Sequence, residues 1–352
     1  MNFPEKLTKM APYEPAKDLC PIRLDANESC FSVPQQVSER IRRALEELSF
    51  ERYPDPDAWR VREAAAKAFG VQTRQLVAGN GSDELIFLIL TAFLPRGGRL
   101  MVLEPDFSMY RFYAGLCELE ILSHERAPEF RASVEEILFH AEKSRPDVLI
   151  FSNPCNPAGR GFCRQEIRRL LTGLSGTLVV VDEAYMDFWD QSMLAEVEEF
   201  PNLLILRTLS KAYALAGIRL GFAAANQKLT ALLNRCRSPF NINCMTQAAG
   251  AAALADSSWV AEQVEEILQN KRLLQQNLCG LCADRPGYRV MGSRTNFINF
   301  LTPRCGEIHQ RLAEHGISVR LFEALGLLRI TVGTKEENAA LLGALTEILQ
   351  GE

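Results

Sequence analysis

Short apolar segments alternate with helical ones through the middle of this chain, and this alternation restricts the fold more than any other feature. Four such segments end at polar or proline-bearing turns, at residues 99–103, 148–151, 178–181 and 203–206. Apolar strands separated by helical stretches such as 164–174 are typical of a parallel sheet covered on both faces. The pattern predicts an α/β fold, in which ligands bind just past the carboxyl ends of the strands.

The last third of the chain has a different pattern, which predicts a second, smaller domain. Its expected elements are a long helical region, three short strands and a closing helix, at residues 243–280, 297–301, 317–320, 327–332 and 335–349. A length of 352 residues also suits about two domains. We therefore expect an N-terminal arm (1–28), a large domain (50–245) and a small domain formed by residues 29–49 and 246–352.

Composition limits the class of partner. The chain has 39 Lys and Arg against 44 Asp and Glu, a net charge of −5, which does not favour binding to nucleic acid or anionic membranes. No apolar stretch approaches the roughly 20 residues of a spanning helix. The first residues lack the apolar core of a secretory signal, and we interpret the ten scattered cysteines as reduced thiols. These features predict a cytoplasmic enzyme that acts on small molecules.

A lysine comes shortly after the last of the four apolar segments. Lys211 directly follows Ser210, and a lysine at the end of a buried strand can form a Schiff base with a carbonyl cofactor. Ser210 and Arg219 then offer a hydroxyl and a guanidinium, which suit a phosphate group. Taken alone, the pattern fits an ordinary exposed lysine better, because most lysines lie at the surface.

An acidic pair, Asp182 and Glu183, ends another apolar segment. A carboxylate in this position can hold a protonated pyridine nitrogen, which makes a pyridine ring an electron sink. The metal-binding strand of nucleoside triphosphatases has a similar pattern, but those proteins also need a Gly-Lys-Ser/Thr loop. No lysine of this chain follows a glycine, so that interpretation fails. An acid that simply caps the strand end remains an alternative.

Two turns add weaker signals. Residues 79–84 (Gly-Asn-Gly-Ser-Asp-Glu) open an apolar helix, and the free amides there can bind an anion or form a plain helix cap. Asn156 lies in a proline-rich turn and can donate to a ring oxygen, although such residues also favour turns in general. We expect no metal site, because Cys279 and Cys282 lack a second pair to complete a zinc tetrahedron.

The types and order of these motifs resemble the pyridoxal-phosphate (PLP)-dependent aminotransferases of fold type I, and among them the histidinol-phosphate aminotransferase family. The most specific segments are 210–221, which begins Ser-Lys-Ala, and 328–333 (Leu-Arg-Ile-Thr-Val-Gly). The other matching segments are residues 24–28, 52–54, 79–84, 105–110, 156–159 and 182–185. The resemblance implies a large domain with a mostly parallel seven-stranded sheet flanked by helices, plus a smaller α+β domain.

The resemblance also implies a role for each matching residue at the cofactor. Lys211 would bond covalently to PLP, and Asp182 would pair with the pyridine nitrogen. Tyr185 and Asn156 would hydrogen-bond the ring oxygen, and Phe107 would stack on the ring. The groups expected to hold the phosphate are Ser210, Arg219 and the amides of Gly81, Ser82 and Asp83.

At the substrate, the resemblance assigns Arg329 to a carboxylate or phosphate and Arg320 to a second anionic group. Asn156 and Tyr13 would face the substrate as well. Tyr53 resembles the residue that reaches the cofactor phosphate of the neighbouring subunit, which implies a homodimer with shared sites.

The implied reaction is transamination of L-histidinol phosphate with 2-oxoglutarate in histidine biosynthesis. One alternative keeps the fold and cofactor but takes phenylalanine or another aromatic amino acid. A second is threonine-phosphate decarboxylation, although such relatives carry a His-Gly-Gly pattern where this chain has residues 24–28. A non-catalytic regulator would need a DNA-binding segment and would not need the set Lys211, Asp182 and Tyr185.

Overall fold

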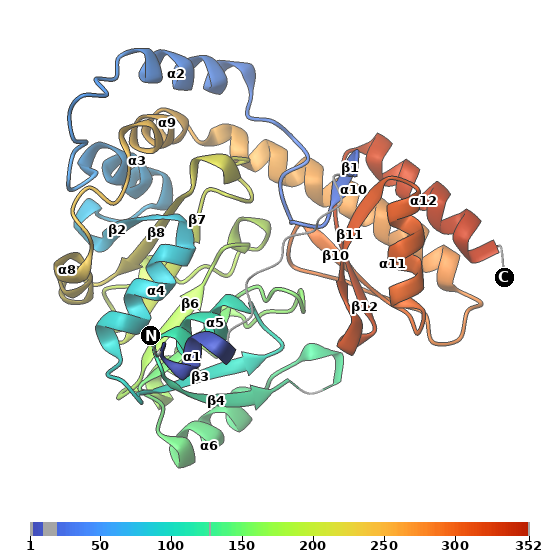
Figure 1. The fold of residues 1–352 in the computed structure, drawn as a ribbon, viewed down its shortest axis with the longest axis horizontal. Helices are drawn as coiled ribbons and strands as arrows, with labels where there is room; N and C mark the ends of the chain where they lie inside the picture. Colours follow the sequence, from blue (N-terminus) through green and yellow to red (C-terminus); the bar gives the residue numbers. More distant parts are fainter. Residues whose placement is uncertain (1–2, 10–19, 127, 351–352) are drawn as a thin grey trace.

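A seven-stranded sheet forms the centre of the larger part of the molecule (Figure 1). The computed structural model describes residues 3–9, 20–126 and 128–350. The strands lie in the order β2-β8-β7-β6-β5-β3-β4. Their bounds are β2 Leu76–Asn80, β3 Arg99–Glu104, β4 Glu120–Glu125, β5 Val148–Ser152, β6 Leu178–Asp182, β7 Leu203–Thr208 and β8 Leu220–Ala225. The predicted α/β fold with a mostly parallel seven-stranded sheet is confirmed.

One strand of this sheet, β8, is antiparallel to both of its neighbours, β2 and β7. The other neighbouring pairs are parallel. A parallel return needs a crossover of roughly a dozen or more residues, and the segment 209–219 between β7 and β8 is too short for one. The chain therefore turns straight back, and this loop, which holds Lys211, stays at the carboxyl edge of the sheet.

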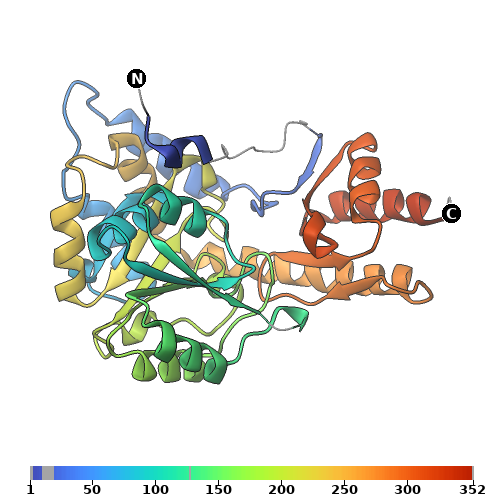
Figure 2. The ribbon, with the colours of Figure 1, turned by 60° about the horizontal axis from the view of Figure 1, so that its bottom comes forward.

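Alternate residues of the buried strands face two different layers of helices. Val180 and Leu204 pack with α4, α5 and α8, whereas Val179 and Val181 pack with α3, α6 and α7. In Figure 2 the sheet lies between these two layers. The bounds are α3 Trp59–Phe69, α4 Gly81–Phe93, α5 Met109–Leu116, α6 Val134–Ser144, α7 Arg164–Gly173 and α8 Gln227–Cys236. Burial on both faces explains why these strands are apolar throughout.

A second sheet of five strands lies to one side, in the order β1-β11-β12-β10-β9 (Figure 1). Its strands are β1 Ile22–Leu24, β9 Arg289–Met291, β10 Phe297–Leu301, β11 Ile317–Phe322 and β12 Leu327–Thr331. The helices beside it are α10 Ser258–Cys282, α11 Cys305–Glu314 and α12 Lys335–Gln350. β1 pairs in parallel with β11, so the N-terminal segment joins a sheet built from the end of the chain.

The remaining helices bear on the expected domain division. α2 (Gln35–Glu46) packs against α9 (Cys244–Leu254), which also contacts α3. The expected boundary between residues 245 and 246 falls inside α9, and the division into domains stays a prediction. The other short elements are α1 Glu5–Lys9 and the 3₁₀ helices Thr73–Gln75, Pro128–Phe130, Met186–Phe188, Leu194–Glu196, Ala216–Ile218 and Glu323–Leu325.

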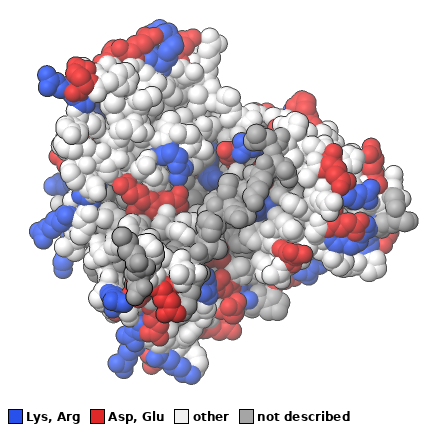
Figure 3. Space-filling model, viewed as in Figure 1, with Lys and Arg blue, Asp and Glu red and all other residues white. Residues whose placement is uncertain are grey.

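Charged side chains of both signs are interspersed over the face shown in Figure 3, without a large area of one sign. Among the described residues, no helix is both long and apolar enough to cross a membrane.

Candidate active site

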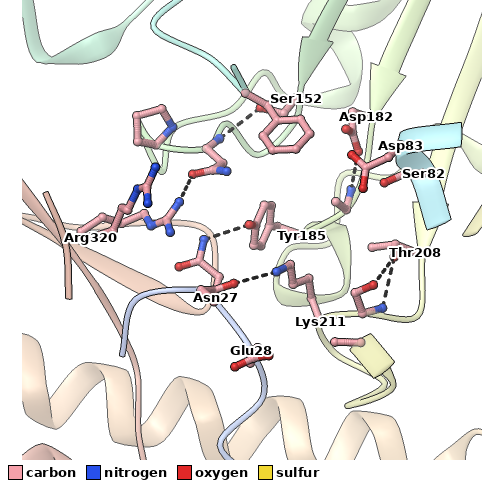
Figure 4. A pocket seen from close by; sticks show the side chains of 18 of the residues that line it. Asn27, Glu28, Ser82, Asp83, Ser152, Asp182, Tyr185, Thr208, Lys211 and Arg320 are labelled. Carbon is pink, nitrogen blue, oxygen red and sulfur yellow. Dashed lines mark hydrogen bonds between the residues drawn. The ribbon is translucent and has the colours of Figure 1, made fainter. Parts of the chain in front are cut away.

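A cavity of about 520 Å³ lies between the carboxyl edge of the large sheet and one face of the second sheet. Figure 4 shows its side chains converging from both sides. The predicted site residues that line it are Ser82, Asp83, Phe107, Asn156, Asp182, Tyr185, Ser210, Lys211, Arg219, Arg320 and Arg329. Gly81 lies next to Ser82 at the start of α4. The structure therefore brings together residues that the sequence places far apart.

Asp182 is the last residue of β6 and is only 3% exposed. Its carboxylate accepts hydrogen bonds from the Tyr110 hydroxyl at 2.8 Å and from the Ala184 N–H at 3.1 Å. Burial raises the pKa of Asp182 to about 7, because desolvation disfavours the charged form. A cation facing this carboxylate would lower its pKa again by stabilising the charged form, so the position suits a protonated ring nitrogen. Tyr110 was not assigned a role from the sequence, although it ends the matching segment 105–110.

Lys211 lies in the loop between β7 and β8, and its Nζ donates to the carbonyl of Ala26 at 2.9 Å. Burial lowers the pKa of Lys211 to about 8, and the positive charge of Arg329 contributes further. The ammonium also lies 5.9 Å from the centre of the Tyr185 ring. A lowered pKa leaves more of the neutral amine near neutral pH, which is the form that attacks carbonyl groups.

One end of the cavity forms where α4 begins beside the loop after β7. The side chain of Arg219 pairs with Asp83 there, with 2.9 Å between Nη2 and Oδ2. Gly81 has a φ of +79°, and a Cβ added to it would lie 2.7 Å from Arg219 Nη2. A glycine is therefore required if the guanidinium is to lie over the first turn of the helix.

Two hydroxyl groups complete this end of the cavity. The Thr208 hydroxyl donates to the Ser210 hydroxyl oxygen at 2.9 Å, and the Ser210 N–H donates to the Thr208 oxygen at 3.1 Å. Free helix amides, hydroxyls and a guanidinium are the groups that bind phosphate in proteins. Thr208 was missed by sequence reasoning, since a threonine at a strand end gives no signal of its own.

The opposite wall carries arginines from the second sheet. Arg320 and Arg329 are direct partners on the antiparallel strands β11 and β12, so their side chains share one face. The Arg329 guanidinium donates to the Asn156 side-chain oxygen and to the Asp25 carbonyl. Arg23, on the neighbouring strand β1, also lines the cavity and was not assigned a role from the sequence. Three positive charges on one face can bind more than one anionic group.

Asn27 connects the N-terminal segment to Tyr185, which follows β6 of the large sheet, and to Thr331 on β12 of the second sheet. Its Nδ2 donates to the Tyr185 hydroxyl at 2.8 Å, and its backbone N–H donates to Thr331 Oγ1 at 3.0 Å. Asn27 adopts a φ of +53°, a conformation that asparagine tolerates better than most residues, and its exposure is 1%. The segment 24–28 matched the family motif, but its contact with Tyr185 could not be derived from the sequence.

Two further predicted aromatic residues, Phe107 and Tyr53, lie in different surroundings. Phe107 lines the cavity and meets Tyr110 edge to face, with ring centres 5.6 Å apart. Tyr53 does not line it: the residue is 82% exposed, and its ring stacks on that of Phe240 with ring centres 4.6 Å apart. Tyr13 lies outside the described residues. Within the described ranges, no group of three His, Cys, Asp or Glu side chains is arranged to hold a metal ion.

Comparison with known proteins shows to which family this chain belongs. The family model for aminotransferase class I and II matches residues 21–345, and the chain belongs to this family. It is 33% identical to the histidinol-phosphate aminotransferase of Clostridium novyi (strain NT) over 97% of this chain and 96% of that protein. It is 37% identical to histidinol-phosphate aminotransferase 1 of Carboxydothermus hydrogenoformans over 99% and 98% of the two chains.

A solved structure agrees in fold. The histidinol-phosphate aminotransferase from Sinorhizobium meliloti, crystallised in complex with pyridoxal-5'-phosphate, superimposes with a TM-score of 0.88. The match covers 98% of this chain and 97% of that chain, at 22% sequence identity. The solved structure confirms the fold, and the family model and the relatives confirm the resemblance to aminotransferases.

Proposed function

We propose that this chain is a PLP-dependent aminotransferase of histidine biosynthesis. It exchanges the amino group of L-histidinol phosphate with 2-oxoglutarate and yields imidazole acetol phosphate and L-glutamate. One observation carries the proposal: Lys211 and Asp182 face the same cavity as Arg320 and Arg329, which come from the other sheet. The names of the relatives and the family membership support the same reaction.

The residues present fit PLP. The amides of Ser82 and Asp83, with Ser210 and Arg219, would hold its phosphate, and the absence of a side chain at Gly81 keeps that end open. Asp182 would hold the ring nitrogen in its protonated form, because the cation restores the ionised state of the buried carboxylate. When bound, PLP supplies an aldehyde and an electron-withdrawing ring that stabilises negative charge on the reacting carbon.

The chain's own residues then move and hold protons. Lys211 Nζ faces the cavity and would be the general base that takes the proton from the reacting carbon of the substrate and, once protonated, the general acid that gives it back. Tyr185, Asn156 and Phe107 all line the cavity. Tyr185 and Asn156 would hydrogen-bond the ring oxygen, and Phe107 would stack on the ring. Asp182, a buried carboxylate, would hold the proton of the ring nitrogen.

Arg329 and Arg320 bind the anionic groups of both substrates. A guanidinium matches carboxylate and phosphate with the same two-pronged geometry, so one wall can accept a phosphate in one half-reaction and a carboxylate in the other. Arg329 is 6% exposed, and its guanidinium lies 5.4 Å from the Phe297 ring centre, which restricts its orientation. Tyr13 stays a predicted substrate contact.

The proposal includes a homodimer and a cytoplasmic location. Tyr53 and Phe240 form an exposed aromatic pair outside the chain's own cavity. Such a pair is typical of an interaction surface, and it supports the role of Tyr53 at the neighbouring subunit's cofactor phosphate.

The experiment is a single half-reaction on the purified protein loaded with PLP. The protein is mixed with L-histidinol phosphate and, separately, with phenylalanine or threonine phosphate, and the visible absorbance of the cofactor is followed. Rapid loss of absorbance with histidinol phosphate alone supports the proposal. Loss only with phenylalanine assigns the enzyme to aromatic amino acids, and release of carbon dioxide from threonine phosphate assigns it to decarboxylation.

A further inference from the structure

A buried ion pair joins Asp106, which lines the cavity, to Arg126, and it has no part in the reaction described so far. Arg126 Nη2 and Asp106 Oδ2 are 2.9 Å apart, and their side chains are 2% and 3% exposed. Arg126 also donates from Nε to the Pro105 carbonyl at 3.2 Å. Burial raises the pKa of Asp106, and the guanidinium opposes that rise. Because desolvation offsets the attraction between buried charges, such a pair is weak evidence for stability alone.

Asp106 determines how Ser152, the last residue of β5, makes its hydrogen bonds. The carboxylate accepts from the Ser152 N–H at 3.2 Å and from the Ser152 hydroxyl. An ionised carboxylate can only accept, so the hydroxyl proton must point at Asp106. The hydroxyl oxygen is then available to the backbone N–H of Asn156, which donates to it at 3.0 Å. The charge on Asp106 thus sets the orientation of the Ser152 hydroxyl, because the two backbone N–H groups of this series can only donate.

Asn156 connects this series of hydrogen bonds to the wall that carries Arg320 and Arg329, here called the substrate wall. Its side-chain oxygen accepts from Arg329, so its Nδ2 is the group that can donate to a ligand in the cavity. A continuous series of hydrogen bonds therefore joins Arg126, which directly follows β4, to Arg329 on β12. The residues between them are Asp106, Ser152 and Asn156.

We propose that Asp106 is a positioning residue for the reaction: acting through Ser152, it fixes Asn156 against the cofactor. Arg126 holds the carboxylate in place, and Asn156 in turn orients Arg329. The inference rests on the proposed function, which places Asn156 at the ring oxygen. A displaced Asn156 changes both the protonation of the bound cofactor and the binding of the substrate carboxylate.

Ser152→Ala is the most direct test, because it removes the acceptor of the Asn156 N–H and leaves the ion pair intact. Thr177→Val is the matched control: its buried hydroxyl donates to the Pro146 carbonyl at 2.8 Å, at the amino end of the same sheet. The first measurement is a pH titration of the visible absorbance of the PLP-loaded protein without substrate. Steady-state kinetics give kcat and the KM for 2-oxoglutarate.

We expect Ser152→Ala to shift the absorbance midpoint by about half a pH unit or more and to lower kcat/KM about tenfold, the size of one hydrogen bond. Thr177→Val should match the wild type in both measurements while losing a similar amount of thermal stability. Equal midpoints and equal kcat/KM in the two variants contradict the positioning role.

Asp106→Asn leaves Arg126 buried opposite a neutral amide and is expected to fold poorly. The double change Asp106→Asn with Arg126→Met removes both charges and keeps the volumes similar. It should recover thermal stability but not the absorbance midpoint, and kcat/KM should remain about a hundredfold low. A double variant that folds and titrates like the wild type overturns the inference alone. Wild-type protein that forms no visible band with PLP overturns the proposed function as well.

Discussion

The two walls of the cavity are built in different ways. On the cofactor wall, Asp182 ends β6, and Ser210 and Lys211 follow the neighbouring strand β7, so the three residues lie within a short stretch of sequence. On the substrate wall, Asn27 bonds to Thr331 across a separation of 304 residues. The first wall is thus set by local connections between strands, and the second depends on the packing of distant segments.

The chemistry of the two walls differs as well. Burial brings the pKa of Asp182 to about 7 and that of Lys211 to about 8, so both groups can change charge near neutral pH. Arg320 and Arg329 are guanidinium groups, which keep their charge and provide geometry for anions. We therefore expect substitutions on the cofactor wall to act on kcat and those on the substrate wall to act on KM.

The largest effect is expected for Lys211→Ala. Loss of the amine removes the covalent attachment and the general base, and we expect kcat to fall about 10⁴-fold. Lys271 is a close control, because burial also lowers its pKa to about 8, but its Nζ donates to the Ser293 and Thr295 carbonyls away from the cavity. Lys271→Ala should destabilise the protein and keep the PLP absorbance band. Turnover by Lys211→Ala near the wild-type rate contradicts the role of this lysine.

The next largest effect is expected for Asp182→Asn, because a neutral side-chain amide cannot stabilise the charge of a protonated ring nitrogen. We expect kcat to fall about 10³-fold with little change in thermal stability. The adjacent Glu183 is also buried but accepts from Ser192 and Met193 and pairs with Arg207. Glu183→Gln should therefore cost about 3 kcal/mol of stability and spare the chemical step. Stopped-flow half-reactions and thermal unfolding of both variants check this contrast. A stable but slow Glu183→Gln together with an unstable Asp182→Asn of normal rate would contradict it.

The cofactor wall was largely predictable from the sequence for a physical reason. A buried strand is recognisable by its apolar run, and whatever follows it must lie at the ligand edge. That rule found Asp182 and Lys211 and placed the Asn156 turn beside them. It did not find Tyr110 or Thr208, since nothing in a single sequence shows which hydroxyl meets a given acceptor.

The substrate wall depended on the family resemblance instead. Arg320 and Arg329 become partners only through the register of β11 and β12, and the contact of Asn27 with Tyr185 joins two sheets. The antiparallel direction of β8 was also not predicted, because its sequence (Leu-Gly-Phe-Ala-Ala-Ala) carries no signal of direction. Such features follow from long-range packing, which local patterns do not encode.

Smaller effects are expected on the substrate wall. Arg329→Met should raise the KM for 2-oxoglutarate by about a hundredfold and Arg320→Met by about tenfold, since charged hydrogen bonds are lost. Arg23→Met should change it by about twofold at most, because this side chain is half exposed and lies 3.5 Å from Glu28. Steady-state kinetics with both substrates give these values. A fall in kcat with an unchanged KM in all three variants contradicts the division of roles between the walls.

The smallest effect is a pH dependence of stability in the cofactor-free protein. Lys211 has a folded pKa of about 8, below its ordinary value of 10.5, so between these values the unfolded chain binds the proton more readily. Stability should fall as the pH drops from about 10.5 to 8 and then level off, and Lys211→Met should lose about 1–3 kcal/mol of this dependence. Lys271→Met should behave alike, since its pKa is also lowered to about 8. Denaturant unfolding across this range measures both.

Addition of PLP separates the two lysines. Only Lys211 faces the cavity, so covalent attachment of the cofactor should remove its titration and leave that of Lys271 unchanged. The unfolding curves of Lys271→Met and the wild type should then still diverge with pH, whereas the contribution of Lys211 should vanish. If PLP instead abolishes the dependence that belongs to Lys271 and leaves that of Lys211, the cofactor attaches to Lys271 and the assignment of Lys211 is wrong.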